Sequence, residues 1–310
     1  MSAQRTALSD GRWHFQHGPM DVILKVEGEP AAVAAAVSSA WSRFDVLLSE
    51  LVSELKVLRQ LVRPGVPVES SGLLGVTARQ MYASCYPFCS VFVTPMAAVA
   101  GAVAQELIAR CQGGGITRAW ANNGGDIALH LAPGESVDVG LFADVSRLAL
   151  PLQQGSPIDG RFRVSSDMPV RGVATSGWRG RSLSLGMADS VTVLAATAAQ
   201  ADVAATLIAN TVNVVHPAIE RLPANQCQDD SDLGERLVTV NVPPLPGSVV
   251  AQALANGVAT AQTMRDAGLI FAAALVCQGQ IRQTASQSQD ATPVRAEPEA
   301  VSRVQRLVLA

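Results

Sequence analysis

The sequence predicts a fold that mixes α-helices with β-strands, and three observations support this. Residues 12–27 alternate in character on both sides of His17-Gly18-Pro19, which predicts a hairpin with strands Arg12–Gln16 and Asp21–Glu27. From Pro30 to about Val62, large apolar residues recur every three or four positions, the period of one helix face. After residue 94, blocks rich in β-branched residues alternate with further helical patterns.

The long helical pattern that starts at Pro30 has two interpretations. Its apolar residues could form a coiled-coil seam, but barely three heptads are more typical of a helix that lies on a sheet. The next helix is predicted in TPMAAVAGAVAQELIARC, where Thr94 is a candidate N-cap and Pro95 takes the first helical position. Its small Ala97, Gly101 and Gln105 face predicts a close backbone approach, either to a strand or to a ligand.

The rest of the chain alternates between predicted strands and helices. SVDVGLF and the block GVATSG…RSLSLGMADSVTVLAAT read as strands, and AQADVAATLIANTVN reads as a helix. Strand RLVTVNV, helix GSVVAQALANGVATAQTMRDAG and a strand within residues 269–279 follow. We expect residues 1–11 to be a flexible N-terminus, residues 12–284 to form the folded domain, and the polar residues 285–310 to form a flexible tail.

Composition narrows the class of protein. With 48% hydrophobic and 16% charged residues, the 310-residue chain can bury a core, and its net charge of −3 offers no basic face for nucleic acid. The longest apolar stretch is interrupted by Asp189 and Asp202, and no signal sequence is visible, so we expect a cytoplasmic protein that does not bind membranes. The five cysteines are irregularly spaced, which predicts free thiols.

The common catalytic signatures do not occur in this sequence. It contains no GxxxxGK[ST] loop, no strand-GxGxxG-helix fingerprint, no HExxH and no GxSxG. The four histidines are scattered, which argues against a zinc site based on histidine. Cys85 and Cys89 are three residues apart, and we read them as small semi-buried side chains rather than as a redox pair.

Three polar clusters remain as candidates for a site. The first is the turn in AWANNGGDIALHL, formed by Asn122, Asn123, Gly124, Gly125 and Asp126. A hairpin needs only the glycines at its tip, so the amides and the carboxylate are free either to cap the turn or to hold a polar ligand. The second cluster combines arginines, hydroxyls and glycines, the chemistry of phosphate recognition or of a surface ion-pair network. Its members are Arg171, Thr175, Ser176, Arg179, Arg181 and Ser182.

The third cluster is the pair Asp202 and Thr206, which stand four apart on a predicted helix. Their oxygens therefore share one helix face. A carboxylate and a hydroxyl so spaced can ligate a hard cation such as Mg²⁺, which usually keeps waters and substrate phosphates in its shell. An Asp-xxx-Thr pair is common, however, and alone it favours an ordinary helix surface.

The order of these motifs resembles the ApbE-like superfamily, whose founding members are Mg²⁺-dependent FAD:protein FMN transferases. The resemblance is carried by TPMAAVAGAVA, NNGGDIALHL, RGVATSGWRGRSLSLGMADSVTVLA, AQADVAATLIAN, HPAI and DSDLG, and covers about residues 12 to 280. It is closest to the branch of that superfamily that carries an uncharacterised-protein-family designation. It implies an α+β fold with T-fold-like halves of antiparallel sheet, packed helices, and a flavin dinucleotide site in a central cleft between two intimately packed lobes.

The resemblance also implies roles for individual residues. Gly124-Gly125-Asp126 matches the transferases' GGD, and Thr175-Ser176-Gly177 matches their TSG. Asp202 and Thr206 match the magnesium ligands, and Ala98 opens the stretch where a helix lends a backbone carbonyl. The transferases follow TSG with a segment that bears a histidine, whereas this chain runs through WRGRSLSLGMADSVTV without one. The flavin transfer step is therefore in doubt.

Two functions follow as expectations. In the first, Mg²⁺ assists a reaction at a phosphate ester or pyrophosphate, with FAD or FMN as the ligand, Arg179 or Arg181 steadying phosphates, and Asp189 as the nearby candidate base. In the second, the protein binds a flavin or other nucleotide-like ligand without catalysis, as a carrier or as an accessory of sulfur metabolism through Cys85 or Cys89. The sequence leaves open a homodimer and a protein acceptor.

Overall fold

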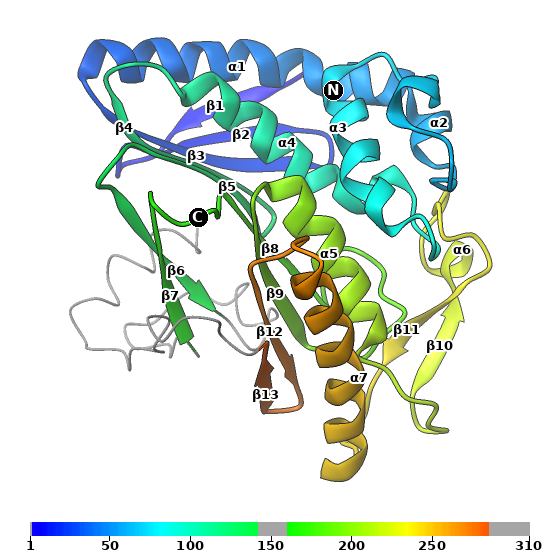
Figure 1. Cartoon of the computed structure of the whole chain (residues 1–310). Coiled ribbons are helices and arrows are strands. Elements are labelled where there is room, and N and C mark those ends of the chain that lie inside the picture. The colour runs from blue at the N-terminus through cyan, green and yellow to red at the C-terminus, as the bar shows by residue number, and fades with distance from the viewer. Residues whose placement is uncertain (1, 142–159, 285–310) are drawn as a thin grey trace. The chain divides into compact units, whose positions relative to one another are not determined.

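The computed structural model describes residues 2–141 and 160–284 (Figure 1). These residues fall into two compact units. Among them, the first unit comprises residues 2–136, 165–174 and 195–203, and the second comprises residues 137–141, 160–164, 175–194 and 204–284. Both units combine helices with antiparallel strand pairs, so the predicted α+β class is confirmed. The predicted tail, residues 285–310, lies outside the described residues.

The first unit contains antiparallel strands that neighbour one another in the order β1-β2-β3-β4-β5-β8. These strands are β1 (Gln4–Ala7), β2 (Trp13–His17), β3 (Met20–Gly28), β4 (Ile116–Asn123), β5 (Asp126–Leu131) and the start of β8 (Gly172–Ser176). Its α-helices are α1 (Pro30–Ser53), α2 (Leu55–Leu58), α3 (Val76–Cys85) and α4 (Val99–Ile108). Short 3-10 turns are η1 (Val68–Ser70), η2 (Tyr86–Phe88), η3 (Pro95–Ala98) and η4 (Ala109–Cys111). The predicted hairpin is confirmed as β2 and β3.

The strand β1 lies in the segment that we expected to be flexible. Residues 4–7 pair with β2, although all four are exposed and carry no amphipathic pattern. The guanidinium of Arg5 lies 5.9 Å from the ring centroid of Trp13 and 5.3 Å from that of Trp41. Backbone pairing and these cation–π contacts, rather than burial, hold the strand, and neither leaves a pattern in the sequence.

The helix α1 lies on the sheet of the first unit, as the second interpretation of its pattern expected. Its buried residues recur at intervals of one, three and four positions: Ala36, Val37, Ala40, Phe44, Leu47 and Leu51. The ring of Phe44 lies 5.4 Å from that of Phe15 on β2. The helix ends at Ser53 rather than near Val62, and the carboxylate of the next residue, Glu54, then accepts the backbone amide of Gly75 at 2.8 Å.

Among the described residues, α1 is the one helix that is long and apolar enough to cross a membrane by length and composition alone. A single such helix is weak evidence, because the core helix of a soluble protein and a signal sequence near an N-terminus pass the same test. Here Phe44 and Leu47 are fully buried in the unit's core.

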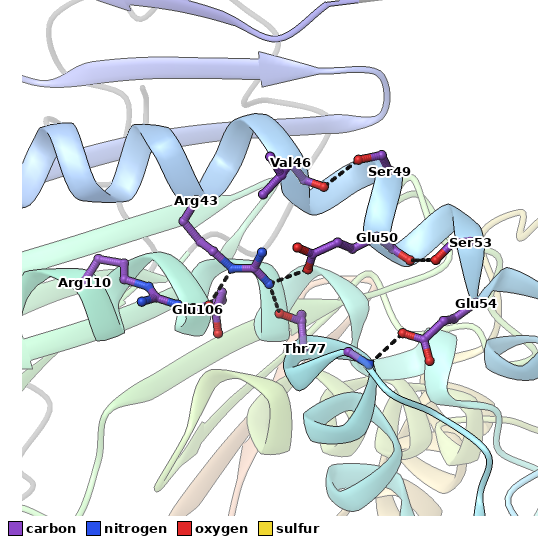
Figure 2. A network of polar contacts seen from close by, with 10 residues as sticks. Arg43, Val46, Ser49, Glu50, Ser53, Glu54, Thr77, Glu106 and Arg110 are labelled. Carbon is purple, nitrogen blue, oxygen red and sulfur yellow. Dashed lines mark hydrogen bonds and ion pairs between the residues drawn. The ribbon is translucent and has the colours of Figure 1, made fainter.

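A buried charge network ties α1 to α3 and α4 (Figure 2). Arg43 on α1 lies 2.7 Å from Glu106 on α4 and 2.7 Å from Glu50, and it donates to the Thr77 hydroxyl on α3 at 3.4 Å. Arg110 also lies 2.7 Å from Glu106, whose side chain is only 3% exposed. The network fixes α4, the helix that carries part of the candidate site, against its neighbours.

The second unit contains three further groups of strands. They are β9 (Ser190–Ala195), β12 (Ala272–Cys277) and β13 (Gln280–Gln283) in that order, the pair β10 (Glu220–Pro223) and β11 (Leu237–Asn241), and the pair β6 (Ser136–Leu141) and β7 (Gly160–Ser165). Its helices are the second half of α5 (Ala198–Thr211), α6 (Ala224–Cys227) and α7 (Gly247–Asp266). The helix α7 packs on β12, where a Cβ atom on Gly257 would lie 2.7 Å from Leu275.

Candidate functional site

Two carboxylates of the first unit, Asp126 and Asp202, lie near enough for the charge of one to act on the other. Asp126 is the first residue of β5 and is 8% exposed, and Asp202 lies in the first half of α5. Burial raises the pKa of the Asp202 carboxyl well above its usual range, and the negative charge of Asp126 raises it further. Asp202 keeps some accessible surface, so it is crowded by protein atoms without being sealed from solvent.

The first turn of α4 partly offsets this electrostatic cost. The backbone amide of Gly101 donates to Asp202 Oδ2 at 2.9 Å, and this amide and that of Ala100 lower the pKa of the carboxyl. Amides in a helix's first turn have no partner within the helix, and the helix dipole favours negative charge there. The helix start thus stabilises part of the charge on Asp202, while burial and Asp126 oppose it.

Glycine at position 101 is what allows α4 to come this close. A Cβ atom there would lie 2.3 Å from the carbonyl oxygen of Ala198, at the start of α5. The predicted close approach of the Ala97, Gly101 and Gln105 face is therefore confirmed, and its partner is a helix rather than a strand. Gln105 Oε1 also accepts the amide of Ala199 at 3.4 Å, which holds the two helices together. Thr94 and Pro95 occupy the predicted positions, but in a 3-10 turn, and the threonine side chain makes no cap bond.

The turn between β4 and β5 joins the same cluster. Gly124 and Gly125 both have positive φ, at 68° and 114°, which suits a two-residue hairpin loop. Asn122 Oδ1 accepts the Gly125 amide at 2.8 Å and so caps the turn, as the simpler interpretation expected. Asn123 instead reaches out of the turn and donates to the Ala100 carbonyl on α4 at 3.2 Å. The turn is thereby attached to the helix that binds Asp202.

Oxygen atoms dominate this cluster, which suits a hard divalent cation. No group of three or more His, Cys, Asp or Glu side chains able to hold a metal occurs within residues 2–141 and 160–284, so a cation here would need further oxygens from waters or a ligand. The two neighbouring carboxylates, one of them destabilised as an anion, would supply the protein's share of such a cation's oxygen ligands. Of the predicted metal ligands, Asp202 belongs to the cluster, buried Ala98 is the residue before α4, and Thr206 lies one turn further along α5.

The arginine and hydroxyl cluster lies in the second unit, apart from Arg171, which belongs to the first and donates to backbone carbonyls there. Thr175 Oγ1 lies 3.0 Å from Thr192 Oγ1, and Gly177 packs so closely that a Cβ atom would lie 2.4 Å from the Asp189 carbonyl. Ser176 is half-buried at the end of β8, and Arg181 and Ser182 are exposed.

Asp189 is surrounded by donors rather than poised as a free base. Its carboxylate accepts the Trp178 indole N–H at 3.3 Å and the backbone amide of Gln278 at 2.5 Å, and Arg179 Nε lies 3.9 Å away. The Arg179 guanidinium lies 4.9 Å from the Trp178 ring centroid and is 40% exposed. Both carboxylate oxygens are thus engaged in hydrogen bonds to Trp178 and Gln278. The role of Asp189 as a base stays a prediction.

Sequence reasoning did not anticipate Gln278 and Trp178. Gln278 has φ 43°, rare for a residue with a side chain, and occupies the β12–β13 turn with Gly279. Its side chain accepts the Leu245 amide at 2.9 Å and donates to the Pro243 carbonyl at 2.7 Å. No local signal in the sequence marks such a residue, since its partners lie more than thirty positions away.

Comparison with known proteins decides the family. A family model described as AbpE bacteria matches residues 5–283. The chain belongs to this family. The predicted resemblance to the ApbE-like superfamily is confirmed, and relatives of the AbpE chain carry the name UPF0280 protein.

Two such relatives show how far the similarity extends. The UPF0280 protein of Methanopyrus kandleri is 35% identical over 208 residues, 66% of this AbpE chain and 78% of the relative. That of Methanothermobacter thermautotrophicus is 40% identical over 140 residues, 42% of this chain and 49% of the relative, so the chain spans about half of its length. Among solved structures, the apo form of Pseudomonas stutzeri flavinyl transferase ApbE has TM-score 0.41 and 11% identity, covering 100% of this chain and 98% of that chain.

Proposed function

We propose that this protein binds Mg²⁺ at Asp126 and Asp202 together with the diphosphate of a flavin or other nucleotide. The observation that carries the proposal is the carboxylate pair itself: two acidic side chains lie close together, and burial and mutual repulsion oppose the charge on Asp202. A divalent cation would offset both the effect of burial and the repulsion between the carboxylates, because it supplies positive charge between them. Phosphate and water oxygens would complete its shell, since the chain offers few further acidic groups there.

Each residue of the cluster has a part in this proposal. Asp202 is oriented by the Gly101 amide and would hold the cation, with Asp126 as the second carboxylate. Asn123 fixes the turn against α4. Bound Mg²⁺ would supply Lewis acidity and charge neutralisation at phosphate oxygens. Thr206, Ala98, Arg179 and Arg181 stay predicted contributors to ligand binding.

A flavin is the ligand that we propose to test first, because the chain belongs to the AbpE family and its motifs resemble those of FMN transferases. Phosphate-ester or pyrophosphate chemistry is the reaction class that a magnesium pair supports. Transfer of FMN to a protein acceptor is not expected, since residues 178–193 contain no histidine to take the acceptor proton.

One observation favours the second function, binding without catalysis. The predicted base Asp189 already accepts two hydrogen bonds, from Trp178 and Gln278. A protein that keeps a metal and nucleotide site but no free base would serve as a carrier.

Calorimetric titration tests the binding step. FAD is titrated into the protein with Mg²⁺ and with EDTA, for the wild type, Asp202→Asn and Asp126→Asn, with exposed Asp45→Asn as the matched control. We expect magnesium-dependent binding in the wild type and the control, and its loss in both other variants. Binding that depends neither on magnesium nor on either substitution would contradict the proposal.

A second experiment tests the flavin directly. The purified protein is denatured, and any released ligand is identified by its absorbance and mass.

A further inference from the structure

A second polar cluster lies in the second unit, around Arg221 on β10. This guanidinium is half-buried, and its Nη2 atom donates to Asn213 Oδ1 at 2.5 Å and to the Val214 carbonyl at 3.3 Å. Within residues 2–141 and 160–284, no carboxylate forms an ion pair with Arg221, and its Nε and Nη1 atoms have no protein acceptor. The Nε–H and Nη1–H donors of the guanidinium are therefore unused by the protein.

The charge on Arg221 is not compensated by the protein. Burial lowers its pKa, and no acidic neighbour acts in the other direction. The adjacent Glu220 is exposed, alternates to the other face of the strand, and accepts Asn241 Nδ2 at 3.0 Å. A half-buried cation without an anionic partner is costly, and a bound anion would offset that cost.

An unpartnered hydroxyl lies directly opposite. Thr239 on β11 is the register partner of Arg221, so their side chains point to the same face of the two-stranded sheet. The Thr239 amide donates to the Ser184 carbonyl at 2.8 Å, away from β10, which makes this a non-hydrogen-bonded pair with closely spaced side chains. Thr239 is 4% exposed, and its Oγ1 atom has no hydrogen-bond partner among the described residues.

We propose that Arg221 and Thr239 form an oxyanion site that takes a phosphate or carboxylate group of a small ligand. A free N–H of Nε or Nη1 would donate a charge-assisted hydrogen bond to the anion, and the Thr239 hydroxyl would donate a second. Thr239 Oγ1 is buried, so the side chains that cover it must move when the anion enters. Asn213 keeps the arginine oriented, because its own Nδ2 atom is fixed on the Leu185 carbonyl at 2.9 Å. This site is independent of the carboxylate pair and of the proposed flavin function.

The test uses inorganic phosphate and succinate as probes. Each is titrated into the full chain at constant ionic strength, with the melting temperature as one readout and phosphorus NMR line width or calorimetry as the other. We expect saturable binding that raises the melting temperature over chloride, and dissociation constants about tenfold or more weaker in Arg221→Gln. The tighter of the two probes assigns the site to phosphate or to carboxylate ligands. Failure of both to saturate would overturn the proposal.

Three further variants separate this site from other causes. Arg221→Lys keeps the charge without the fork, so binding should weaken without being lost. Thr239→Val keeps the shape and removes the unpartnered hydroxyl, so in chloride it should melt at or above the wild-type temperature, yet gain less from the anion. Arg282→Gln, at an exposed position on β13, is the matched control and should keep the response. If Arg282→Gln abolishes the response while Arg221→Gln retains it, the assignment is wrong. It is also wrong if Thr239→Val melts lower than the wild type in chloride, because a bound water then satisfied the hydroxyl.

Discussion

The backbone amide of Gly101 meets the carboxylate of Asp202 at 2.9 Å, across 101 positions of sequence. The contact requires that residue 101 has no Cβ atom, because the Ala198 carbonyl would lie 2.3 Å from it. The missing side chain of Gly101 therefore serves two purposes. It lets α4 pack against α5, and it places the backbone amide that orients the Asp202 carboxylate.

Replacing Gly101 by alanine should therefore affect both. The new methyl group would force α4 away from α5, at a cost of about 1–3 kcal/mol in the free energy of unfolding. It should also weaken magnesium binding, because the Asp202 carboxylate loses its fixed donor. Urea unfolding and magnesium titration measure the two effects. Gly114→Ala is the matched control, since nothing lies within 4 Å of its Cβ position and its φ is not positive. Equal behaviour of the two variants would contradict this account.

The stability of the metal-free protein should fall as pH rises from the ordinary Asp value of 3.8, because the folded-state pKa of Asp202 is raised. A raised folded-state pKa means that the folded state binds the proton more tightly, so its contribution is present below the unfolded-state pKa and is lost as pH rises through the folded-state pKa. Asp202→Asn removes the charge and should flatten this slope and stabilise the protein at pH 7 without metal. Urea unfolding in EDTA between pH 4 and pH 8 measures it. A wild-type profile as flat as the variant's would count against the raised pKa.

Removing Arg43 should destabilise the first unit, because Glu106 is 3% exposed and would keep only Arg110. Breaking a buried pair by deleting one partner costs about 3–5 kcal/mol, and the remaining arginine places Arg43→Met at the low end. The double variant Arg43→Met with Glu106→Leu should recover most of the loss, since no buried charge is left unpaired. Chemical denaturation of the wild type, of Arg43→Met, of Glu106→Leu and of the double variant gives the coupling free energy between the two residues. An additive double variant would show that the network is not coupled.

Asp189→Asn distinguishes a structural role from a catalytic one. An asparagine presents an amide where the Trp178 indole and the Gln278 amide both donate, so one donor would lose its acceptor. We expect a loss of about 1–3 kcal/mol in the free energy of unfolding and a change in tryptophan fluorescence. Asp266→Asn, at the exposed end of α7, is the control. Unchanged stability of Asp189→Asn would contradict a structural role and would favour Asp189 as a base.

The cysteines should react in an order set by burial and pKa. Cys227 is exposed and Cys89 half-buried, whereas Cys85, Cys111 and Cys277 are buried. Burial raises the pKa of Cys111 and Cys277 to about 12, so little thiolate forms at neutral pH. Alkylation of the native protein followed by mass measurement should modify Cys227 first, and all five thiols only after denaturation. The five free thiols agree with the expectation from their spacing. Early modification of Cys111 or Cys277 would show that the unit opens more readily than its packing indicates.

Much of this architecture could be predicted because it leaves a local pattern. The hairpin β2–β3, the helix α1 and the strands β8 and β9 follow from alternation, helical period and β-branched content. The end of α1 at Ser53 could not be predicted, because Glu54 interacts with an amide 21 positions away. Of the candidate site, Asp126, Asp202 and the glycine turn were identified, since polar residues surplus to a turn stand out. The contacts of Asn123 with α4 and of Asp189 with Gln278 depend on long-range packing, which no window of sequence contains.

The register between β3 and β4 also has a consequence for how the chain acquires its structure. Gly28 pairs with Ile116, so this ladder closes a loop that contains all the helices α1 to α4, whereas β2 and β3 meet across a short turn. Pairings of such separation form slowly because loop closure must precede any gain in contacts. The first unit also includes residues 195–203, at the start of α5. During synthesis the Gly101 amide therefore cannot bond to Asp202 until α5 has left the ribosome. A ribosome stalled before Asp202 would therefore hold a nascent chain in which strands β1 to β5 can pair but the carboxylate pair cannot form.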